Sequence, residues 1–323
     1  MKLGLLSTAR INDAILRGAS LTDAVEVVAV GSRDATRAKA YAREHGIARA
    51  HGSYEELLAD PEVDAIYNSL PNSLHVEWSI RALEAGKHVL CEKPLDRSPG
   101  EVQRLFEVAE RHGLVVMEAF MYRHHPQTHA LQELVRSGGI GELRQIRAVF
   151  SFTITDPANV RLRPALAGGA LMDVGCYCVS GSRLLAGEPE LVVGRQVLGE
   201  TGVDLRFDGI LQFPGNVLAQ FYCGFDLPAA SGLEAIGSKG SVLVREPWQC
   251  RDPHLEVNGN RIGVPDVDRY QLELENFAAA AGGEAPPLLG RDDAVGQARV
   301  IEALYRSAES GSAVPLGTGS GAR

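Results

Sequence analysis

Short apolar runs alternate with amphipathic stretches along the first 121 residues of the chain. The apolar runs have the length and composition of strands that are covered on both faces of a parallel sheet. They lie at residues 2–6, 25–30, 47–50, 65–68, 88–91 and 115–118. The stretches between them have helical spacing, most clearly at residues 35–45, 73–85 and 99–112. Because parallel strands are joined by right-handed crossovers, this alternation predicts an α/β domain with a doubly wound sheet.

Several helix ends in this region carry capping signals. Ser53 and Ser98 are each followed three residues later by a glutamate, which is the pattern of a capping box. Pro99 suits the first position of a helix, and Gly46 and Gly113 suit the residue after the last turn. These signals place helix boundaries between the predicted strands.

A different pattern begins near residue 122. Longer strands are predicted at residues 142–152, 205–213 and 217–225, and Pro214-Gly215-Asn216 joins the last two as a turn. Helices are predicted at residues 126–136, 169–185, 269–281 and 292–309. Residues 122–323 are therefore predicted to form a second, α+β domain with a mostly antiparallel sheet. Its end, residues 317–323, is rich in Gly and Ser and is predicted to fray.

The composition narrows the class of protein. A chain of 323 residues is long enough for two domains, and its hydrophobic content of 45% with 23% charged residues is typical of a soluble globular protein. No apolar run is long enough to cross a membrane. The net charge of -9 offers no basic stripe for nucleic acid. Five cysteines, an odd number without framework spacing, suit the reducing cytoplasm.

The turn after the first strand is a candidate phosphate-binding loop. A sheet of this kind usually carries Gly-x-Gly-x-x-Gly there, whereas this chain has Ser7-Thr8-Ala9-Arg10-Ile11. Ser7 and Ala9 occupy places where glycine would let the backbone approach a pyrophosphate. Both residues are small, and the N-terminus of the following helix still offers backbone amides to an anion.

The end of the second strand favours NADP(H) over NAD(H). An NAD site places an acid there for the ribose 2′-hydroxyl, but this chain reads Gly31-Ser32-Arg33 and has no acid before Asp34. Ser32 can donate a hydrogen bond to a 2′-phosphate, and Arg33 can bind it with two donors. The alternative interpretation is that Arg33 is a solvated loop residue.

Two further loops follow predicted parallel strands, at the edge where such sheets bind ligands. Glu92-Lys93-Pro94 ends the fifth strand, and Pro94 restricts the backbone of Lys93. Read alone, this segment could be a surface turn. The loop after the fourth strand contributes Ser69, Leu70, Pro71, Asn72 and His75. Asn72 could simply cap a helix and His75 could be structural, or both could reach a nicotinamide ribose.

In the second half, Asp173 and Tyr177 lie four residues apart and would share one face of a helix. An acid and a phenol together can bind two hydroxyls or move a proton, whereas the alternative is an ordinary helix with a buried tyrosine. His125 and His129 have the spacing of a metal pair but no nearby third ligand, so we expect no metal site. Cys176 and Cys178 are expected to be packing residues.

Several of these segments together resemble one family, that of glucose-fructose oxidoreductase, inositol dehydrogenase and rhizopine catabolism proteins (Gfo/Idh/MocA). The resemblance is carried by residues 7–11, 71–75, 92–94, 120–126 and 169–177. Within the family, the chain is similar to the branch of dihydrodiol dehydrogenases and NADP-dependent xylose dehydrogenases, in which tyrosine stands at the position of Tyr177. The resemblance implies a Rossmann domain, an open and mostly antiparallel sheet, and bound NADP(H). Ser7 and Ala9 depart from the glycine-rich fingerprint but match that branch.

The resemblance also implies an activity, namely hydride transfer between nicotinamide and a carbinol of a sugar or diol. Lys93 and Tyr177 are the candidates for proton transfer, with Tyr177 preferred and the reverse assignment open, and Asp173 would orient the substrate hydroxyl or Lys93. The expected cofactor contacts extend to Glu92, Lys93 and Arg123. A homodimer or homotetramer is expected through the strands at 142–152 and 205–225. The alternative is a non-catalytic NADP-binding regulator of the same fold, similar to a galactose-pathway co-repressor.

Overall fold

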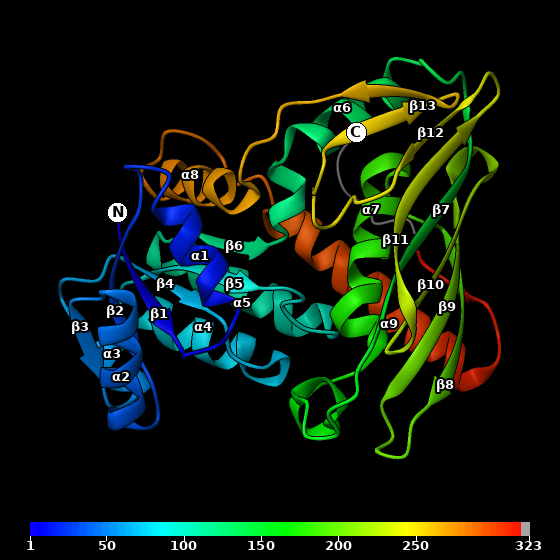
Figure 1. Ribbon diagram of the computed structural model, residues 1–323. Coiled ribbons are helices and arrows are strands. Elements are labelled where there is room, and N and C mark those ends of the chain that lie inside the picture. Colours follow the sequence, from blue (N-terminus) through cyan, green and yellow to red (C-terminus); the bar gives the residue numbers. More distant parts are fainter. Residues whose placement is uncertain (318–323) are drawn as a thin grey trace. The chain divides into compact units, whose positions relative to one another are not determined.

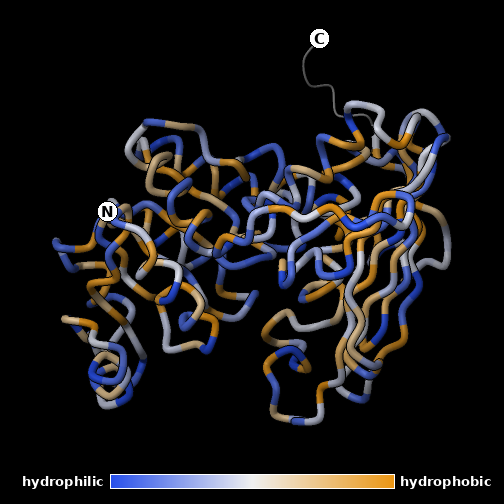
Figure 2. The backbone as a smooth tube through the Cα atoms, turned by 45° about the horizontal axis from the view of Figure 1, so that its top comes forward, coloured by the Kyte–Doolittle hydropathy of each residue, from blue (hydrophilic) through white to orange (hydrophobic). Residues whose placement is uncertain are grey.

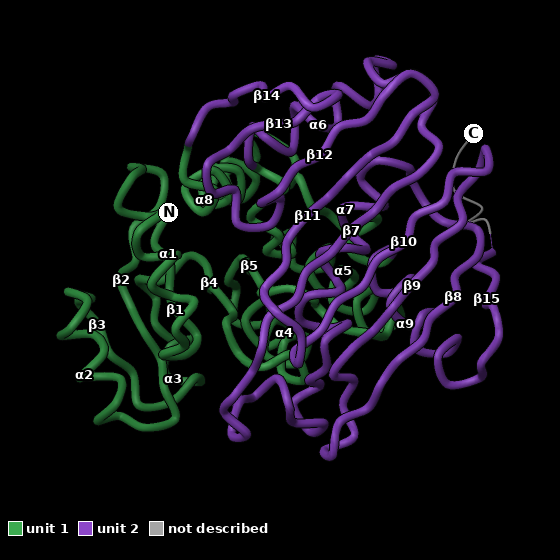
Figure 3. Tube along the Cα trace, turned by 45° about the vertical axis from the view of Figure 1, so that its right-hand side comes forward, with its two compact units in different colours: residues 1–124, 267–295 green, residues 125–266, 296–323 purple. Residues whose placement is uncertain are grey.

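The computed structural model describes residues 1–317, and the chain divides into two compact units (Figure 3). The first unit contains residues 1–124 and 267–295. The second contains residues 125–266 and those from 296 onward. Residues 318–323, most of the end expected to fray, lie outside the described residues.

The first unit is built on a six-stranded parallel sheet (Figure 1). Its strands are β1 (Lys2–Leu6), β2 (Glu26–Gly31), β3 (Arg49–His51), β4 (Ala65–Asn68), β5 (His88–Glu92) and β6 (Val116–Ala119). They pair in the order β3-β2-β1-β4-β5-β6, and every pair is parallel. The prediction of a doubly wound sheet is confirmed. The order changes direction between β1 and β4, where such sheets bind ligands beyond the carboxyl ends of their strands.

The helices of this unit join consecutive strands, except for the last one. They are α1 (Asn12–Ala19), α2 (Ala35–His45), α3 (Tyr54–Leu58), α4 (His75–Glu84), α5 (Pro99–His112) and α8 (Arg269–Ala281), with 3-10 turns at Asn72–Leu74 and Met121–His124. Helix α8 packs closely on α1, because a Cβ added at Gly18 would lie 2.9 Å from the backbone nitrogen of Gln271. The chain therefore returns to the first unit after building most of the second.

The predicted helix caps are confirmed in part. Ser53 Oγ accepts the N–H of Glu56 at 3.0 Å, and Ser98 Oγ accepts that of Glu101 at 3.4 Å. The reciprocal half of each capping box is absent. Glu56 accepts the N–H of Gly52 at 2.7 Å instead of that of Ser53. The N–H of Ser98 donates to Asp96 at 2.7 Å, which takes the place of the expected Glu101.

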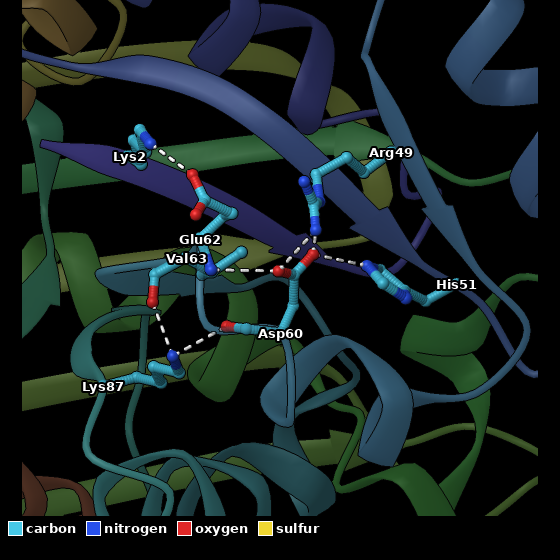
Figure 4. A network of polar contacts seen from close by, with 7 residues as sticks. All are labelled: Lys2, Arg49, His51, Asp60, Glu62, Val63 and Lys87. Atoms are coloured by element: carbon cyan, nitrogen blue, oxygen red, sulfur yellow. Dashed lines mark hydrogen bonds and ion pairs between the residues drawn. The ribbon is translucent and has the colours of Figure 1, made fainter.

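A buried carboxylate ties together the segment that precedes β4 (Figure 4). Asp60 is 4% exposed and accepts two hydrogen bonds from Arg49, at 2.6 and 3.0 Å. Its carboxylate also lies 2.9 Å from Nε2 of His51 and accepts the N–H of Glu62 at 3.0 Å. The buried ammonium of Lys87 donates to the backbone oxygen of Asp60 at 2.8 Å. This network fixes β3 and the start of β5 to the same loop.

The second unit contains a nine-stranded mixed sheet. Its strands are β7 (Leu143–Thr153), β8 (Leu191–Leu198), β9 (Asp204–Phe213), β10 (Val217–Gly224), β11 (Asp226–Gly237), β12 (Ser241–Val244), β13 (His254–Val257), β14 (Asn260–Gly263) and β15 (Val314–Pro315). They pair in the order β14-β13-β12-β11-β7-β10-β9-β8-β15. Only β7 and β10 pair in parallel among the described strands of this sheet, so the predicted mostly antiparallel sheet is confirmed.

Helices cover one face of this sheet. They are α6 (Pro126–Arg136), α7 (Cys176–Ala186) and α9 (Arg291–Ser310), the last of which begins in the first unit, with short helical turns at Val160–Leu162, Pro164–Leu166, Leu171–Gly175 and Pro214–Asn216. Helix α7 packs against β7, β10 and β11. Hydrophobic residues are frequent along these strands (Figure 2). In β9 and β10 they also occur on the outer face, where Ile210 is 46% and Tyr222 43% exposed. No helix within residues 1–317 combines the length and hydrophobicity needed to span a bilayer.

Candidate functional site

The turn between β1 and α1 is held by side chains rather than by glycines. Ser7 takes a φ of +152°, a region that glycine enters most easily. Its Oγ lies 2.7 Å from Oγ of Ser69 and accepts the N–H of Ala9 at 3.1 Å. Asn12 Nδ2 donates to the Ser7 carbonyl at 2.8 Å. Serine thus replaces glycine because neighbouring polar groups support this backbone conformation.

The rest of this loop faces outward to different degrees. Thr8, Ala9 and Ile11 are partly exposed, and Arg10 is exposed. Helix α1 follows directly, with no side-chain cap at its N-terminus. Its first-turn amides belong to the part of a Rossmann domain where a pyrophosphate binds.

The turn after β2 offers a hydroxyl and a guanidinium. Ser32 is buried and its Oγ accepts the N–H of Asp34 at 3.3 Å. Asp34 Oδ1 accepts the N–H groups of Thr36 at 2.8 Å and of Arg37 at 3.1 Å, so it caps α2. Arg33 is exposed. Asp34, the first acid after β2, therefore binds the first backbone amides of α2.

Arg33 also lies close to Tyr54, the first residue of α3. Burial raises the pKa of Tyr54, and the positive charge of Arg33 and a hydrogen bond from it oppose that rise. The guanidinium is thus held over the same end of the sheet as Ser32, which is where the sequence predicts the 2′-phosphate.

His75 connects the loops after β4 and β5. It is 1% exposed, with Nδ1 2.8 Å from the carbonyl oxygen of Pro94 and Nε2 2.7 Å from that of Leu70. Burial lowers the pKa of His75 to about 4. The hydrogen bonds to the two carbonyls oppose this decrease, and the positive charge of Lys93 adds to it. A neutral ring has one N–H, which donates to one carbonyl at a time. His75 thereby links the loop of residues 69–72 to the segment that carries Lys93.

The remaining residues of the loop after β4 lie beside this histidine. Leu70 and Ser69 are buried, and the N–H of Leu70 donates to Asn68 Oδ1 at 3.2 Å. Pro71 and Asn72 are partly exposed. The alternative interpretation of Asn72 as a helix cap is not supported, because the N-cap residues of the 3-10 turn and of α4 are Pro71 and Leu74, and neither makes a side-chain cap. The predicted contact of Asn72 with the cofactor stays a prediction.

Lys93 follows the last residue of β5 and is partly buried. The peptide bond from Lys93 to Pro94 is cis. Glu92 Oε1 accepts a hydrogen bond of 2.5 Å from the hydroxyl of Tyr67 in β4, and the N–H of Leu95 donates to Glu118 at 2.9 Å. The lysine is thus held from both sides, at the carboxyl edge of the sheet.

A buried acid lies near Glu92. Glu273 in α8 is 1% exposed, and among the described residues its Oε1 has no hydrogen-bond partner. Burial raises the pKa of Glu273 well above its usual range, and the negative charge of Glu92 raises it further. The positive charge of Arg269 opposes this rise. Burial and Glu92 also raise the pKa of Tyr67. Burial thus favours the protonated form of Glu273, beside an acid that is adjacent to Lys93. No local pattern in the sequence indicates Glu273, because α8 is far from β5 along the chain.

Arg123 is placed in the first unit as well. It is 9% exposed, and its Nη1 lies 3.5 Å from Oδ1 of Asp293 at the start of α9. Its predicted contact with the cofactor stays a prediction.

The second unit holds Asp173 and Tyr177. Residues 171–175 form a π-helical turn and α7 begins at Cys176, where the sequence predicted one regular helix. Asp173 Oδ2 accepts a hydrogen bond of 2.6 Å from Nε of Arg161. Arg161 was missed in the sequence, because a contact across a loop leaves no periodic pattern. The pair places a carboxylate that can accept hydrogen bonds beside a cation.

Tyr177 is 5% exposed and packs among aromatic rings. Its ring centroid lies 5.4 Å from that of Phe150 and 5.8 Å from that of Trp248. Trp248 is fully buried, and its Nε1 donates to the carbonyl of Val149 at 2.9 Å. These rings fix the direction of the phenol. Lys93 belongs to the first unit and Asp173 and Tyr177 to the second, so their joint action is part of the proposal below.

The structure also places the histidines and cysteines that were considered in the sequence. Among residues 1–317, no group of three or more metal-ligating side chains is arranged around a common centre. His125 Nδ1 accepts the N–H of Gln127 at 3.0 Å and caps α6. All five cysteines, including Cys176 and Cys178, are buried, and none of them forms a disulfide.

Comparison with known proteins shows the family. Residues 4–120 match the model of an oxidoreductase family with an NAD-binding Rossmann fold, and residues 128–243 match the GFO/IDH/MocA C-terminal domain. The chain is 38% identical over 325 residues to a D-xylose 1-dehydrogenase (NADP(+)) of Haloferax volcanii, covering 98% of this chain and 100% of that protein. It is 39% identical to a trans-1,2-dihydrobenzene-1,2-diol dehydrogenase of Oryctolagus cuniculus, covering 74% and 73%.

A solved structure supports the same relation. The 3-ketoreductase of Actinomadura kijaniata, in complex with NADP and TDP-benzene, superimposes with a TM-score of 0.90 at 30% identity, covering 95% of this chain and 97% of that one. The chain belongs to the Gfo/Idh/MocA family of NAD(P)-dependent oxidoreductases, dehydrogenases and reductases that act on CH–OH groups.

Proposed function

We propose that the protein is an NADP-dependent dehydrogenase that transfers hydride between nicotinamide and a carbinol or carbonyl of a sugar or related cyclic diol. The proposal rests on the observation that Asp34 caps α2 and uses its carboxylate for the amides of that helix. It leaves Ser32 and Arg33 as the polar groups of the turn where an NAD site would present an acid. Two relatives are named for activities on xylose and on a dihydrodiol, which supports the substrate class.

The first unit would hold the cofactor. The loop of Ser7–Ile11 and the N-terminus of α1 would receive the pyrophosphate, and Ser32 with Arg33 the 2′-phosphate. The loop of residues 69–72, with Glu92, Lys93 and Arg123, would line the nicotinamide half. His75, which bonds to backbone carbonyls, would act by holding two of these loops together. When bound, NADP(H) supplies the hydride acceptor or donor.

The protein's own residues would manage the proton. Oxidation of a hydroxyl requires a base within hydrogen-bond reach of its oxygen. Tyr177 would accept or donate that proton, with its ring fixed by Phe150 and Trp248. Lys93 would be its hydrogen-bonding and electrostatic partner, and Asp173, paired with Arg161, would orient a substrate hydroxyl. The reverse assignment of Lys93 and Tyr177 is the competing mechanism.

Steady-state turnover tests this proposal. Xylose, glucose, keto-deoxysugars and trans-dihydrodiols would be supplied with NADP and, separately, with NAD. We expect reduction of the cofactor with at least one substrate and a higher kcat/KM with NADP. Tight binding of NADP without turnover on any substrate would instead favour the non-catalytic regulator.

We also propose that the outer face of the nine-stranded sheet is covered by a second copy of the chain. Ile210 of β9 and Leu218 and Tyr222 of β10 are between 40% and 46% exposed there. Apolar side chains that lie next to one another on a sheet face offer a surface that a symmetric partner can cover. Light scattering at micromolar concentration should give the mass of a dimer or tetramer, and a monomer would contradict the proposal.

A further inference from the structure

The helical segment that carries Asp173 and Tyr177 has no cap of its own. Its π-helical turn begins after Ala170 and α7 begins after Gly175, and neither position makes a side-chain cap. The preceding residues, Gly168 and Gly169, have no side chains that could accept a hydrogen bond. The first amides of a helix need acceptors from outside it. The segment therefore depends on an acceptor from another element.

Asp204, the first residue of β9, supplies that acceptor. Its Oδ2 accepts the N–H of Leu171 at 2.6 Å, and a backbone hydrogen bond to Ala170 adds to this contact. Its Oδ1 accepts the hydroxyl hydrogen of Tyr305 in α9 at 2.9 Å. Asp204 is 3% exposed. One carboxylate thus joins β9, α9 and the start of the segment.

Gly169 makes room for this carboxylate. Its φ is +127°, and a Cβ added there would lie 2.1 Å from Oδ1 of Asp204. Any other residue would both strain the backbone and displace the acid. The glycine and the distant aspartate therefore form one arrangement.

We infer that Asp204 is a positioning residue, a cap supplied from β9 that fixes the orientation in which the segment presents Asp173 and Tyr177. The inference rests on the proposed function of those two residues. Asp204 would touch neither substrate nor cofactor and would act through the backbone of Ala170 and Leu171.

The ionisation of Asp204 gives this role a pH dependence. Burial raises its pKa to about 6, against the opposing bonds from Leu171 and Tyr305. Two titratable groups among the described residues face Asp204. The Tyr305 hydroxyl from α9 donates a hydrogen bond to it. The Cys223 thiol lies in β10, and its pKa is raised by burial and by the neighbouring Cys178 and Asp204. Above pH 6 both carboxylate oxygens accept. Below it, one oxygen carries a proton and the cap weakens, so turnover should fall as pH drops through about 6.

Hydrogen exchange of the protein without cofactor or substrate tests the cap directly. Asp204→Asn should speed exchange in residues 168–178 about tenfold, the equivalent of one hydrogen bond, and Asp204→Ala should do so more strongly. Tyr305→Phe, which keeps the carboxylate, should have a smaller effect in the same segment. Asp208→Asn is the matched control, since it removes an exposed carboxylate from the same strand.

Kinetics then separate positioning from simple support of the fold. For Asp204→Asn we expect kcat to fall about tenfold or more and to lose its decline near pH 6, while the affinity for NADP stays unchanged. Wild-type exchange in residues 168–178, or equally faster exchange throughout the second unit, would overturn the inference. If the wild type turns over no substrate, the proposed function fails, and hydrogen exchange still decides whether Asp204 is the cap.

Discussion

Replacing Arg33 with alanine should weaken the binding of NADP much more than that of NAD. Arg33 is the cation of the turn after β2, and Asp34, the acid beside it, is engaged by the amides of α2. The variant therefore removes a donor from the predicted 2′-phosphate site without freeing an acid that could bind a ribose hydroxyl. NAD has no phosphate there and should lose little.

The expected magnitude follows from the exposure of Arg33. A charge-assisted hydrogen bond contributes about 1.5 to 3 kcal/mol, which corresponds to roughly a tenfold to hundredfold change in affinity. Because Arg33 is exposed, salt screens its charge, and we expect the lower end of this range at physiological ionic strength. The effect should grow as the salt concentration is lowered.

Titration of the cofactor-free protein with NADPH and NADH, followed by nucleotide fluorescence, measures both dissociation constants without turnover. Arg43→Ala is the matched control, because it removes an exposed arginine from the far end of α2. It should change neither constant by more than a few fold. Equal weakening of NADPH and NADH by Arg33→Ala would show that Arg33 does not recognise the 2′-phosphate.

Two further predictions concern stability, measured by urea unfolding. Asp60→Ala should lower the free energy of unfolding by about 3 to 5 kcal/mol, because it leaves a buried network without its acceptor. Glu62→Gln, which breaks an exposed pair with Lys2, should leave the free energy of unfolding nearly unchanged. Burial alone would raise the pKa of Asp60, but its donors hold it below the usual range, so its contribution is present above pH 4 and should be lost as the pH falls further. The raised pKa of Glu273 has the opposite effect on the pH dependence of stability. The unfolded chain releases a proton that the folded protein keeps, so stability falls as the pH rises above about 4.5. Glu273→Gln should therefore be more stable than the wild type at pH 8, and an unchanged pH slope would contradict the protonated acid.

Local features of the sequence predicted many elements closely. The bounds of β1 and β4 match the apolar runs, and those of α2, α6 and α8 match the predicted helices, because glycines, prolines or caps limit each of these segments. The alternation of strands and helices also predicted the parallel, doubly wound sheet, but not the order of its strands. The short strands from β12 to β15 were not predicted, since two to four residues are too few to show an alternation.

The candidate site was predicted only where its residues lie in consecutive segments. Asp173 and Tyr177 were found by their spacing, but the π-helical turn that contains Asp173 was not, because the spacing of apolar residues does not distinguish it from a regular helix. Arg161, Asp204 and Glu273 act through contacts across loops or between distant elements. Such contacts follow from the packing of the folded chain, and no periodicity of a single sequence records them.

The central claim is that Tyr177 and Lys93 move the proton that accompanies hydride transfer. Tyr177→Phe is the sharpest test, since phenylalanine keeps the ring contacts with Phe150 and Trp248 and removes only the hydroxyl. Single-turnover formation of NADPH from the best substrate of the panel should slow about a hundredfold to ten-thousandfold in this variant and in Lys93→Met, with NADP affinity within a few fold of the wild type. The double variant should be scarcely slower than the slower single one. Normal turnover of Tyr177→Phe across the pH range would contradict the account and leave Lys93 as the proton-transferring group.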